Sequence, residues 1–510
     1  MQRSQSVSSI PLTTLIYTLA AVCLLSQATS AQGPTNRPNV LFIAVDDLRP
    51  ELNCYGTSHS PIKAITPNLD RLAATGIRFT NAYCNQAVCG ASRLSLMTGL
   101  YPEFTKERTY HVTDWRKRWS NVVTLNQHFT ANGYTTVGLG KIYHNTSGVA
   151  VDEENWSKWI KVVGKGYANP DSLKKTRETK SSLPGTKSKK RGPSTESAKD
   201  ADFVYADGLR AKQGVRQIKR LADSKEPFFL AVGFTKPHLP FNAPTKYWDL
   251  YDRESFSLPS NLGFPPGYPQ WARNRQAGEL RAYSDIPRDG TPVEFPDELN
   301  KRLLHGYHAC VSYTDHNVGL LLSALEDNEI ADNTIVVFWA DHGWKLGDHS
   351  SWCKHTNFEC DTRVPLLVRC PRSMTVTGES NALVELIDLY PTLCDLCGLH
   401  QPPHLQGRSF ATVLGNPDSK HRDFAYSSYP HSDWESKRRV IGHSIRSERV
   451  RYTEWWDAKN DEVIARVATD IEADPGETTN LLPDQKELGR ELSKQLKRRV
   501  LAARVADLPQ

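Results

Sequence analysis

Several short apolar runs are spaced along the chain, separated by longer stretches in which apolar and polar residues alternate at helical spacing. The runs cover residues 40–45, 228–234 and 334–340, and a weaker one covers 134–140. Within each run the apolar residues are nearly continuous and do not alternate with polar ones, as expected of strands buried on both faces of a parallel sheet. The pattern therefore predicts an α/β fold with a large, mostly parallel central sheet.

The stretches between the runs predict helices, which we place at residues 66–76, 123–132, 206–222 and 301–326. From about residue 400 the pattern changes to short strands and a closing helix, placed near residues 424–426, 440–446, 449–454 and 485–505. We expect a large catalytic domain over residues 31–400 and a smaller C-terminal α+β subdomain over residues 401–510.

Each predicted central strand ends in charged or titratable residues. In chain order these are Asp46 and Asp47, Lys141 and His144, Lys236 and His238, and Asp341 and His342. Open α/β sheets bind ligands at the carboxyl ends of their strands, so we expect these side chains to meet at one edge. Adjacent buried carboxylates repel each other and need a cation, and carboxylate oxygens favour calcium or magnesium over zinc. Lysines and histidines beside such a metal suit an oxyanion.

The net charge of +6 is concentrated in one segment, residues 161–199, which holds eleven Lys/Arg and three Asp/Glu. The segment is rich in Lys, Ser, Thr, Gly and Pro and predicts a loop or insertion. It could be a solvated loop or an electrostatic lip that attracts a polyanionic substrate. Because the excess is local, we expect no nucleic-acid partner.

Residues 1–30 have the pattern of a signal peptide, with Arg3 followed by an apolar run and a small-residue cleavage site at residues 28–30. Cys23 permits a lipoprotein reading, although the residues before it match a lipobox poorly. No later segment is apolar enough to span a membrane. We expect a secreted or periplasmic protein without a membrane span.

Cysteines other than Cys23 and Cys89 number eight, which permits disulfides without defining their pairing. Cys394 and Cys397 lie in a stretch with helical periodicity that ends at Gly398. We interpret this pair as small core residues instead of a zinc or redox motif.

The stretch Cys89-Gly-Ala-Ser-Arg93, followed by Thr98-Gly99, resembles the signature of formylglycine-dependent sulfatases. Ala91 stands where many members have proline. A helix that begins at Cys89 would present unpaired N–H groups to an anion. Further motifs of the same family lie at residues 45–50, 140–144, 236–241, 341–344 with Lys354, and 470–481. Within the family the motifs are most similar to those of the iduronate-2-sulfatase branch.

The resemblance implies an alkaline-phosphatase-like three-layer sandwich with a short antiparallel sheet in the C-terminal subdomain. It implies that a maturation enzyme oxidises Cys89 to formylglycine (3-oxoalanine). It also implies one Ca²⁺ held by the side chains of Asp46, Asp47, Asp341 and His342 and by an oxygen on the modified Cys89.

The resemblance further implies how the site would work. The hydrated aldehyde would attack sulfur and form a covalent sulfate, with Asp341 accepting the proton of the attacking hydroxyl. The implied catalytic residues are Cys89, Arg93, Lys141, His144, His238 and Lys354. Lys141, His238, Lys354 and Lys236 would bind the substrate. His238 would protonate the departing alcohol, and His144 would remove the proton that allows sulfate to leave.

The implied function is removal of sulfate from a sulfated oligo- or polysaccharide, with the 2-O-sulfate of a uronic acid as the specific expectation. A phosphonate monoester or phosphodiester hydrolase on the same scaffold is one alternative, because these esters are also tetrahedral anions. A non-catalytic protein that binds sulfated glycans through residues 161–199 is the other.

Overall fold

The computed structural model describes residues 37–56, 62–145, 148–178, 191–199, 201–274, 277–290, 294–374, 376–433 and 436–508. Residues 38–510 form one compact unit. The predicted signal peptide and Cys23 lie outside the described residues. Among the helices that are described, none has the length and hydropathy needed to cross a lipid bilayer.

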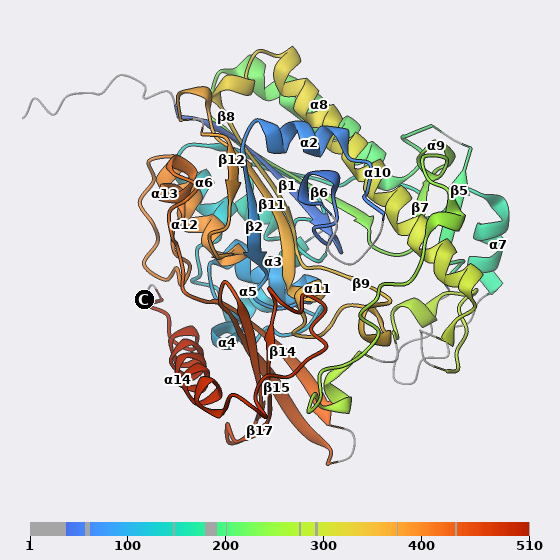
Figure 1. Ribbon diagram of the computed structural model, residues 1–510. Coiled ribbons are helices and arrows are strands. Elements are labelled where there is room, and N and C mark those ends of the chain that lie inside the picture. Colours follow the sequence, from blue (N-terminus) through green and yellow to red (C-terminus); the bar gives the residue numbers. More distant parts are fainter. Residues whose placement is uncertain are drawn as a thin grey trace, which may run out of the picture. The chain divides into compact units, whose positions relative to one another are not determined.

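A nine-stranded mixed sheet forms the centre of this unit (Figure 1). The strand order is β12-β2-β11-β8-β1-β6-β3-β4, and β13 also pairs with β2. Neighbours from β8 to β4 are parallel, whereas β11 runs antiparallel to both β8 and β2. The mostly parallel sheet predicted from the apolar runs is therefore confirmed. Its strands are β1 (Asn39–Asp46), β2 (Ile77–Tyr83), β3 (Thr135–Gly140), β4 (Lys158–Ile160), β6 (Phe228–Pro237), β8 (Thr334–Ala340), β11 (Arg363–Arg369), β12 (Gly378–Ser380) and β13 (Val384–Glu385).

The carboxyl ends of the four central strands are in register. Ala44 of β1 pairs with Gly233 of β6 and with Trp339 of β8, and Gly233 pairs in turn with Gly140 of β3. A Cβ on Gly233 would lie 2.3–2.5 Å from the backbone of Lys141, so only glycine allows the chain after β3 to cross here. The residues that follow these strands therefore reach the same edge of the sheet.

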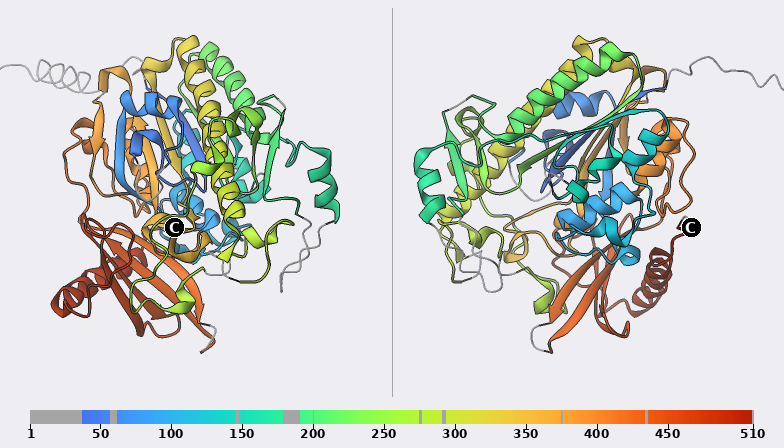
Figure 2. Two further views of the ribbon diagram at one scale, coloured as in Figure 1. Left: turned by 45° about the vertical axis from the view of Figure 1, so that its right-hand side comes forward. Right: turned by 180° about the vertical axis from the view of Figure 1, so that it is seen from behind.

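Helices cover both faces of the sheet, which gives three layers (Figures 1 and 2). One layer contains α2 (Pro67–Ala74), α8 (Ala206–Ser224) and α10 (Asp297–Asp327). The other contains α3 (Cys89–Thr98), α6 (Leu125–Ala131) and α12 (Leu389–Leu396). The predicted helices in these layers are confirmed, with ends that differ by at most four residues. Shorter helices are α4 (Pro102–Thr105), α5 (Trp115–Arg118), α9 (Thr245–Trp248), α11 (Glu359–Thr362) and α13 (Ala411–Gly415).

The described part of the basic segment is more ordered than its composition predicts. It contains α7 (Pro170–Glu178) and β5 (Thr195–Ala198), and β5 pairs with β7 (Phe241–Pro244). The buried carboxylate of Glu196 accepts hydrogen bonds from the Ala168 amide at 2.7 Å and the Tyr205 hydroxyl at 2.7 Å. These tertiary contacts order a stretch that lacks periodicity. Residues 179–190 lie outside the described part.

The C-terminal region contains a four-stranded antiparallel meander and a closing helix. Sequence reasoning placed three strands and missed the last one, although it begins with the apolar run Val463-Ile464-Ala465. The elements are β14 (Ala425–Asp433), β15 (Arg438–Arg446), β16 (Val450–Asp457), β17 (Val463–Asp470) and α14 (Lys486–Ala503). A separate two-stranded hairpin, β9 (Lys345–Leu346) and β10 (Trp352–Cys353), lies in the catalytic region. The boundary between the two domains stays a prediction.

All nine cysteines of the described residues have free thiols. Cys394 and Cys397 are buried at the end of α12 and contribute to the main apolar core. The interpretation of this pair as small core residues is therefore confirmed.

A buried charge cluster connects the C-terminal meander to the catalytic region. Glu359, on α11, pairs with Arg446 of β15 at 3.3 Å and with Arg451 of β16. Glu477 accepts the Glu359 amide at 2.6 Å and pairs with Arg451 at 3.3 Å. Burial raises the pKa of Glu477 to about 7 although Arg451 opposes the rise, whereas the arginines overcome burial and lower the pKa of Glu359 to about 2.

This cluster should make stability depend on pH through Glu477. A pKa raised above the unfolded value of 4.5 contributes stability that is complete below that value and lost as pH rises through about 7. Between about pH 5 and about pH 8, the free energy of unfolding of the wild type should fall by an amount on the order of 3 kcal/mol because of Glu477. We expect this fall to be absent in Glu477→Gln. Urea unfolding across this range measures the difference between variant and wild type.

Glu487→Gln is the matched control, because Glu487 forms only an exposed pair with Arg490. This variant should follow the wild type at every pH. A Glu477→Gln variant whose stability runs parallel to the wild type over the whole range would contradict the assignment.

Candidate active site

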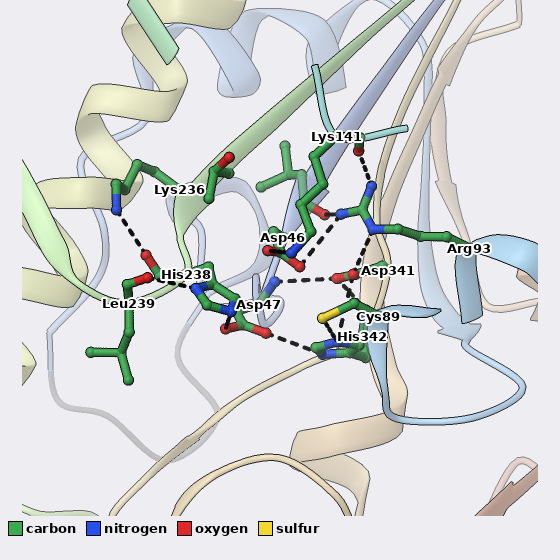
Figure 3. Close-up of polar contacts among 12 residues, drawn as sticks. Asp46, Asp47, Cys89, Arg93, Lys141, Lys236, His238, Leu239, Asp341 and His342 are labelled. Atoms are coloured by element: carbon green, nitrogen blue, oxygen red, sulfur yellow. Dashed lines mark hydrogen bonds and ion pairs between the residues drawn. The ribbon is translucent and has the colours of Figure 1, made fainter. Parts of the chain in front are cut away.

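Three buried aspartates meet at the carboxyl edge of the central sheet. Asp46 ends β1, Asp47 follows it, and Asp341 follows β8. The Asp47 amide donates to Asp341 Oδ1 at 3.2 Å, which ties the two strand ends together. All three carboxylates are fully buried. Figure 3 shows them converging with Cys89 and His342.

Cys89 is the first residue of α3, as the sequence predicts, and its thiol faces the aspartates. Its Sγ lies 3.2 Å from Nε2 of His342. The other ring nitrogen of His342 lies 3.0 Å from the Gly343 carbonyl, which only accepts, so Nδ1 carries the hydrogen and Nε2 presents its lone pair to the site. Burial raises the pKa of the Cys89 thiol to about 12, so an unmodified thiol here is not a thiolate nucleophile.

Arg93, one turn further along α3, connects several parts of the site. Its Nε donates to Asp341 Oδ2 at 2.8 Å, and its terminal nitrogens contact the carbonyls of Val45 at 3.1 Å and of Lys141. A weaker contact of 3.5 Å reaches Asp46. One fully buried guanidinium therefore connects the ends of β1, β3 and β8, which only its planar fork of five donors permits.

Two lysines compensate the remaining carboxylates. Lys141, which follows β3, pairs with Asp46, and Lys354, which follows the β9–β10 hairpin, donates to Asp47 Oδ1 at 2.7 Å. Burial alone would raise the pKa of Asp46, but Lys141, His238 and Arg93 hold it well below its usual value. The pKa of Asp47 is raised by burial and by the charge of Asp46, even with Lys354 beside it. Of the two adjacent carboxylates, Asp47 is therefore the one that the protein's own cations stabilise less in its charged form.

The site fits a hard divalent cation. Asp46, Asp47, Cys89 and His342 each offer one ligand atom, and these atoms lie within 4.8 Å of one another. The buried Asp47 Oδ2 has no hydrogen-bond partner among the described residues. A dication would occupy that free acceptor and supply the missing positive charge. The family resemblance implies Asp341 as a further ligand. Its Oδ2 lies 3.5 Å from Nε2 of His342.

His238 follows β6 and reaches the same site, where its Nε2 lies 3.9 Å from Asp47 Oδ2. Its closest side-chain partner is Glu279, at 2.7 Å, which also lies 3.2 Å from Lys354. Burial alone would raise the pKa of Glu279, but Lys354 and His238 hold it well below its usual value. Sequence reasoning missed Glu279 because residues 250–300 have neither periodicity nor a motif that would single it out.

The two remaining predicted residues differ in placement. His144 lies beside the Lys141 turn with its ring 5.9 Å from that of Tyr110, and burial and Lys141 lower its pKa to about 3. Lys236 is directed elsewhere, because its ammonium donates to the carbonyl of His238 at 3.0 Å (Figure 3) and to that of Pro240. The structure therefore gives Lys236 a role in holding the loop that carries His238.

Two solved structures are similar over almost the whole chain. A 2-O GAG sulfatase superposes with a TM-score of 0.68 at 21% identity, covering 93% of this chain and 95% of that one. The phosphonate monoester hydrolase of Silicibacter pomeroyi superposes with a TM-score of 0.69 at 21% identity, covering 91% and 95%. At such identity these likenesses define the fold alone, and they confirm an alkaline-phosphatase-like three-layer sandwich.

Sequence comparisons define the family. The sulfatase family model matches residues 38–399, and the model for the C-terminal part of N-sulphoglucosamine sulphohydrolase matches residues 347–506. Iduronate 2-sulfatase of Homo sapiens is 33% identical over an alignment 526 positions long, covering 89% of this chain and 92% of the human protein. The chain belongs to the sulfatase family, as the motifs predicted. That family implies a formylglycine and a divalent metal.

The Arg93 network generates a prediction about stability. Arg93→Leu leaves Asp341 buried without its closest cation, and breaking a buried ion pair in this way costs about 3–5 kcal/mol. Chemical unfolding followed by circular dichroism should record that loss. Arg71→Leu is the control, because Arg71 forms a half-exposed pair with Glu326 and should change the free energy of unfolding by under about 1 kcal/mol. Equal losses in the free energy of unfolding for the two substitutions would rule out the proposed role of Arg93 in compensating the buried charge of Asp341.

Proposed function

We propose that this sulfatase removes sulfate esters from a sulfated glycan, and that its preferred substrate carries a 2-O-sulfated uronic acid. The single observation that carries the activity is the convergence of Cys89, at the start of α3, with three buried aspartates and His342. The substrate class is supported by the 33% identity to human iduronate 2-sulfatase over most of both chains and by the motifs shared with that branch.

The metal in this proposal is one Ca²⁺ per chain. Asp46, Asp47, Asp341 and His342 would hold it together with an oxygen on the modified Cys89. Oxygen donors dominate this set, which favours a hard dication over zinc. When bound, the cation would supply positive charge to the sulfate oxygens and to the modified residue.

Conversion of Cys89 to formylglycine would supply a hydrated aldehyde with two hydroxyls in place of the thiol. The thiol itself is unsuited to attack, because burial raises its pKa to about 12. Arg93 would orient the hydrate, since its guanidinium is fixed on Asp341 and on the strand-end carbonyls. Asp341 would accept the proton of the attacking hydroxyl.

The remaining residues would bind the sulfate group and move protons. Lys141 and Lys354 would neutralise sulfate oxygens, since both ammonium groups already lie among the aspartates. His238 would protonate the departing alcohol, with Lys354 beside it. His144 would accept a proton before sulfate leaves. Burial and Lys141 lower its pKa to about 3, which keeps the ring neutral near pH 7 but makes it a weak base. Lys236 would contribute to substrate binding through the loop that carries His238, because its ammonium donates to backbone carbonyls of that loop.

The proposal includes export through a signal peptide at residues 1–30, with maturation by a formylglycine-generating enzyme. The exported enzyme would then bind a sulfated oligo- or polysaccharide outside the cytoplasm. The described part of the basic segment, residues 161–178 and 191–199, could attract such a polyanion.

A phosphonate monoester hydrolase is the second candidate, since solved enzymes of that kind share the fold. The cations described above would accept either tetrahedral anion. Only direct comparison of substrates separates the two activities.

A panel of defined sulfated oligosaccharides tests the substrate. We expect fastest sulfate release from an oligosaccharide that carries a 2-O-sulfated uronic acid, loss of release after treatment with EDTA, and recovery with Ca²⁺. Ion chromatography of sulfate measures each step. Faster turnover of an aryl phosphonate ester than of every sulfate ester would favour the second candidate. Recovery with Zn²⁺ but not Ca²⁺ would contradict the metal assignment.

Cys89→Ser tests the chemistry at the first position of α3. Serine has one hydroxyl where the hydrate has two, so we expect loss of multiple turnover in a folded protein. Wild-type turnover by this variant would refute the proposal. Mass spectrometry of the Cys89 peptide from active wild-type protein should detect an aldehyde in place of the thiol, and Cys84→Ser, which changes another buried cysteine, provides the control for folding.

A further inference from the structure

Glu279 contacts two of the side chains that bind the substrate in the proposed function. Its Oε1 lies 2.7 Å from His238 Nε2, and its Oε2 lies 3.2 Å from Lys354 Nζ. Each carboxylate oxygen therefore meets a different basic side chain. The Glu279 side chain is 17% exposed, so both contacts are shielded from bulk water and are stronger than surface pairs.

The His238 ring is fixed at both nitrogens. Nδ1 lies 2.6 Å from the carbonyl of Leu239, and Nε2 faces Glu279. Lys236 holds the backbone on the same loop by donating to the His238 carbonyl at 3.0 Å. The ring cannot rotate about its χ angles without breaking one of these contacts. Without Glu279, the ring would keep its contact with the Leu239 carbonyl and the longer one, of 3.9 Å, between Nε2 and Asp47 Oδ2.

Lys354 is held at its backbone and at its ammonium. Its carbonyl accepts from Asn274 Nδ2 at 2.6 Å, and Nζ bridges Asp47 Oδ1 at 2.7 Å and Glu279 Oε2. The ammonium also lies 5.0 Å from the centre of the Trp344 ring. Asn274 and Glu279 come from the same irregular stretch between β7 and α10, so this stretch positions both basic residues.

We propose that Glu279 is a positioning residue that aims His238 and Lys354 at the oxygen of the departing alcohol. The inference rests on the proposed function. As the sulfur–oxygen bond breaks, its electron pair stays on the alcohol oxygen, and that oxygen takes the proton from His238 Nε2. The same ring nitrogen faces Glu279, so the carboxylate holds the ring in place until the ester oxygen competes for it.

This role predicts an effect that depends on the leaving group. A sugar alcohol is a poor leaving group and needs its proton in the transition state, whereas a nitrophenolate departs without one. General acid catalysis contributes about 10²–10⁴-fold where the proton is needed. Misdirecting His238 should therefore slow sugar sulfates much more than activated aryl sulfates, while a general loss of structure would slow both alike.

The test uses matured, metal-loaded enzyme carrying Glu279→Gln or Glu279→Ala. We expect kcat for the best sulfated oligosaccharide to fall at least about tenfold more than kcat for 4-nitrophenyl sulfate. The Gln variant keeps the size of the side chain and one acceptor, so its loss should be the smaller of the two. Glu254→Gln is the matched control, because Glu254 forms an exposed pair with Lys301 at 2.8 Å and should leave both rates unchanged.

Equal losses on both substrates, or no loss on the oligosaccharide, would overturn the role of Glu279. Thermal unfolding of each variant separates a folding defect from a kinetic one, and the Gln variant decides the question if the Ala variant is unstable. A wild-type enzyme that releases no sulfate from any ester would instead overturn the proposed function.

Discussion

Mutual repulsion among buried carboxylates is the constraint on which the site depends. Asp46, Asp47 and Asp341 lie at one sheet edge, and two unit charges 4 Å apart interact by about 4 kcal/mol at an effective dielectric constant of 20. Each carboxylate therefore needs a cation from another element. Arg93 comes from α3 and Lys141 from the end of β3, while Lys354 follows the hairpin. The pKa of Asp47 stays raised even with these cations, and a bound dication would stabilise the charged form of its carboxylate.

Sequence reasoning predicted most of this arrangement because the strand ends are encoded locally. A continuous apolar run that stops at a charged residue identifies both a buried strand and the position of its carboxyl end, as for β1 and Asp46. The register of β1, β6, β3 and β8 then brings those ends together. Cys89 was located by motif, and its place at the start of α3 follows from the same signature.

What sequence reasoning missed depends on contacts between distant segments. Glu279 lies in a stretch without periodicity, and only the folded chain brings it to His238 and Lys354. The resemblance gives Lys236 a role in substrate binding, and the fold directs its ammonium to the carbonyls of His238 and Pro240. β5 pairs with the distant strand β7, and its Glu196 accepts hydrogen bonds from Ala168 and Tyr205. None of these contacts is indicated by a local pattern of hydrophobic and polar residues.

Charge balance also bears on which anion the site accepts. With a dication bound, the three aspartates and Glu279 face three permanent cations, Arg93, Lys141 and Lys354, which leaves an excess of about one positive charge before His238 is counted. Sulfate esters, phosphonate monoesters and phosphodiesters carry one negative charge, whereas a phosphate monoester carries nearly two at pH 7. Glu279 thus disfavours the dianion through repulsion. Discrimination among the monoanions must come from the group that leaves, and there the contacts of Glu279 with His238 and Lys354 favour a substrate whose alcohol needs a proton.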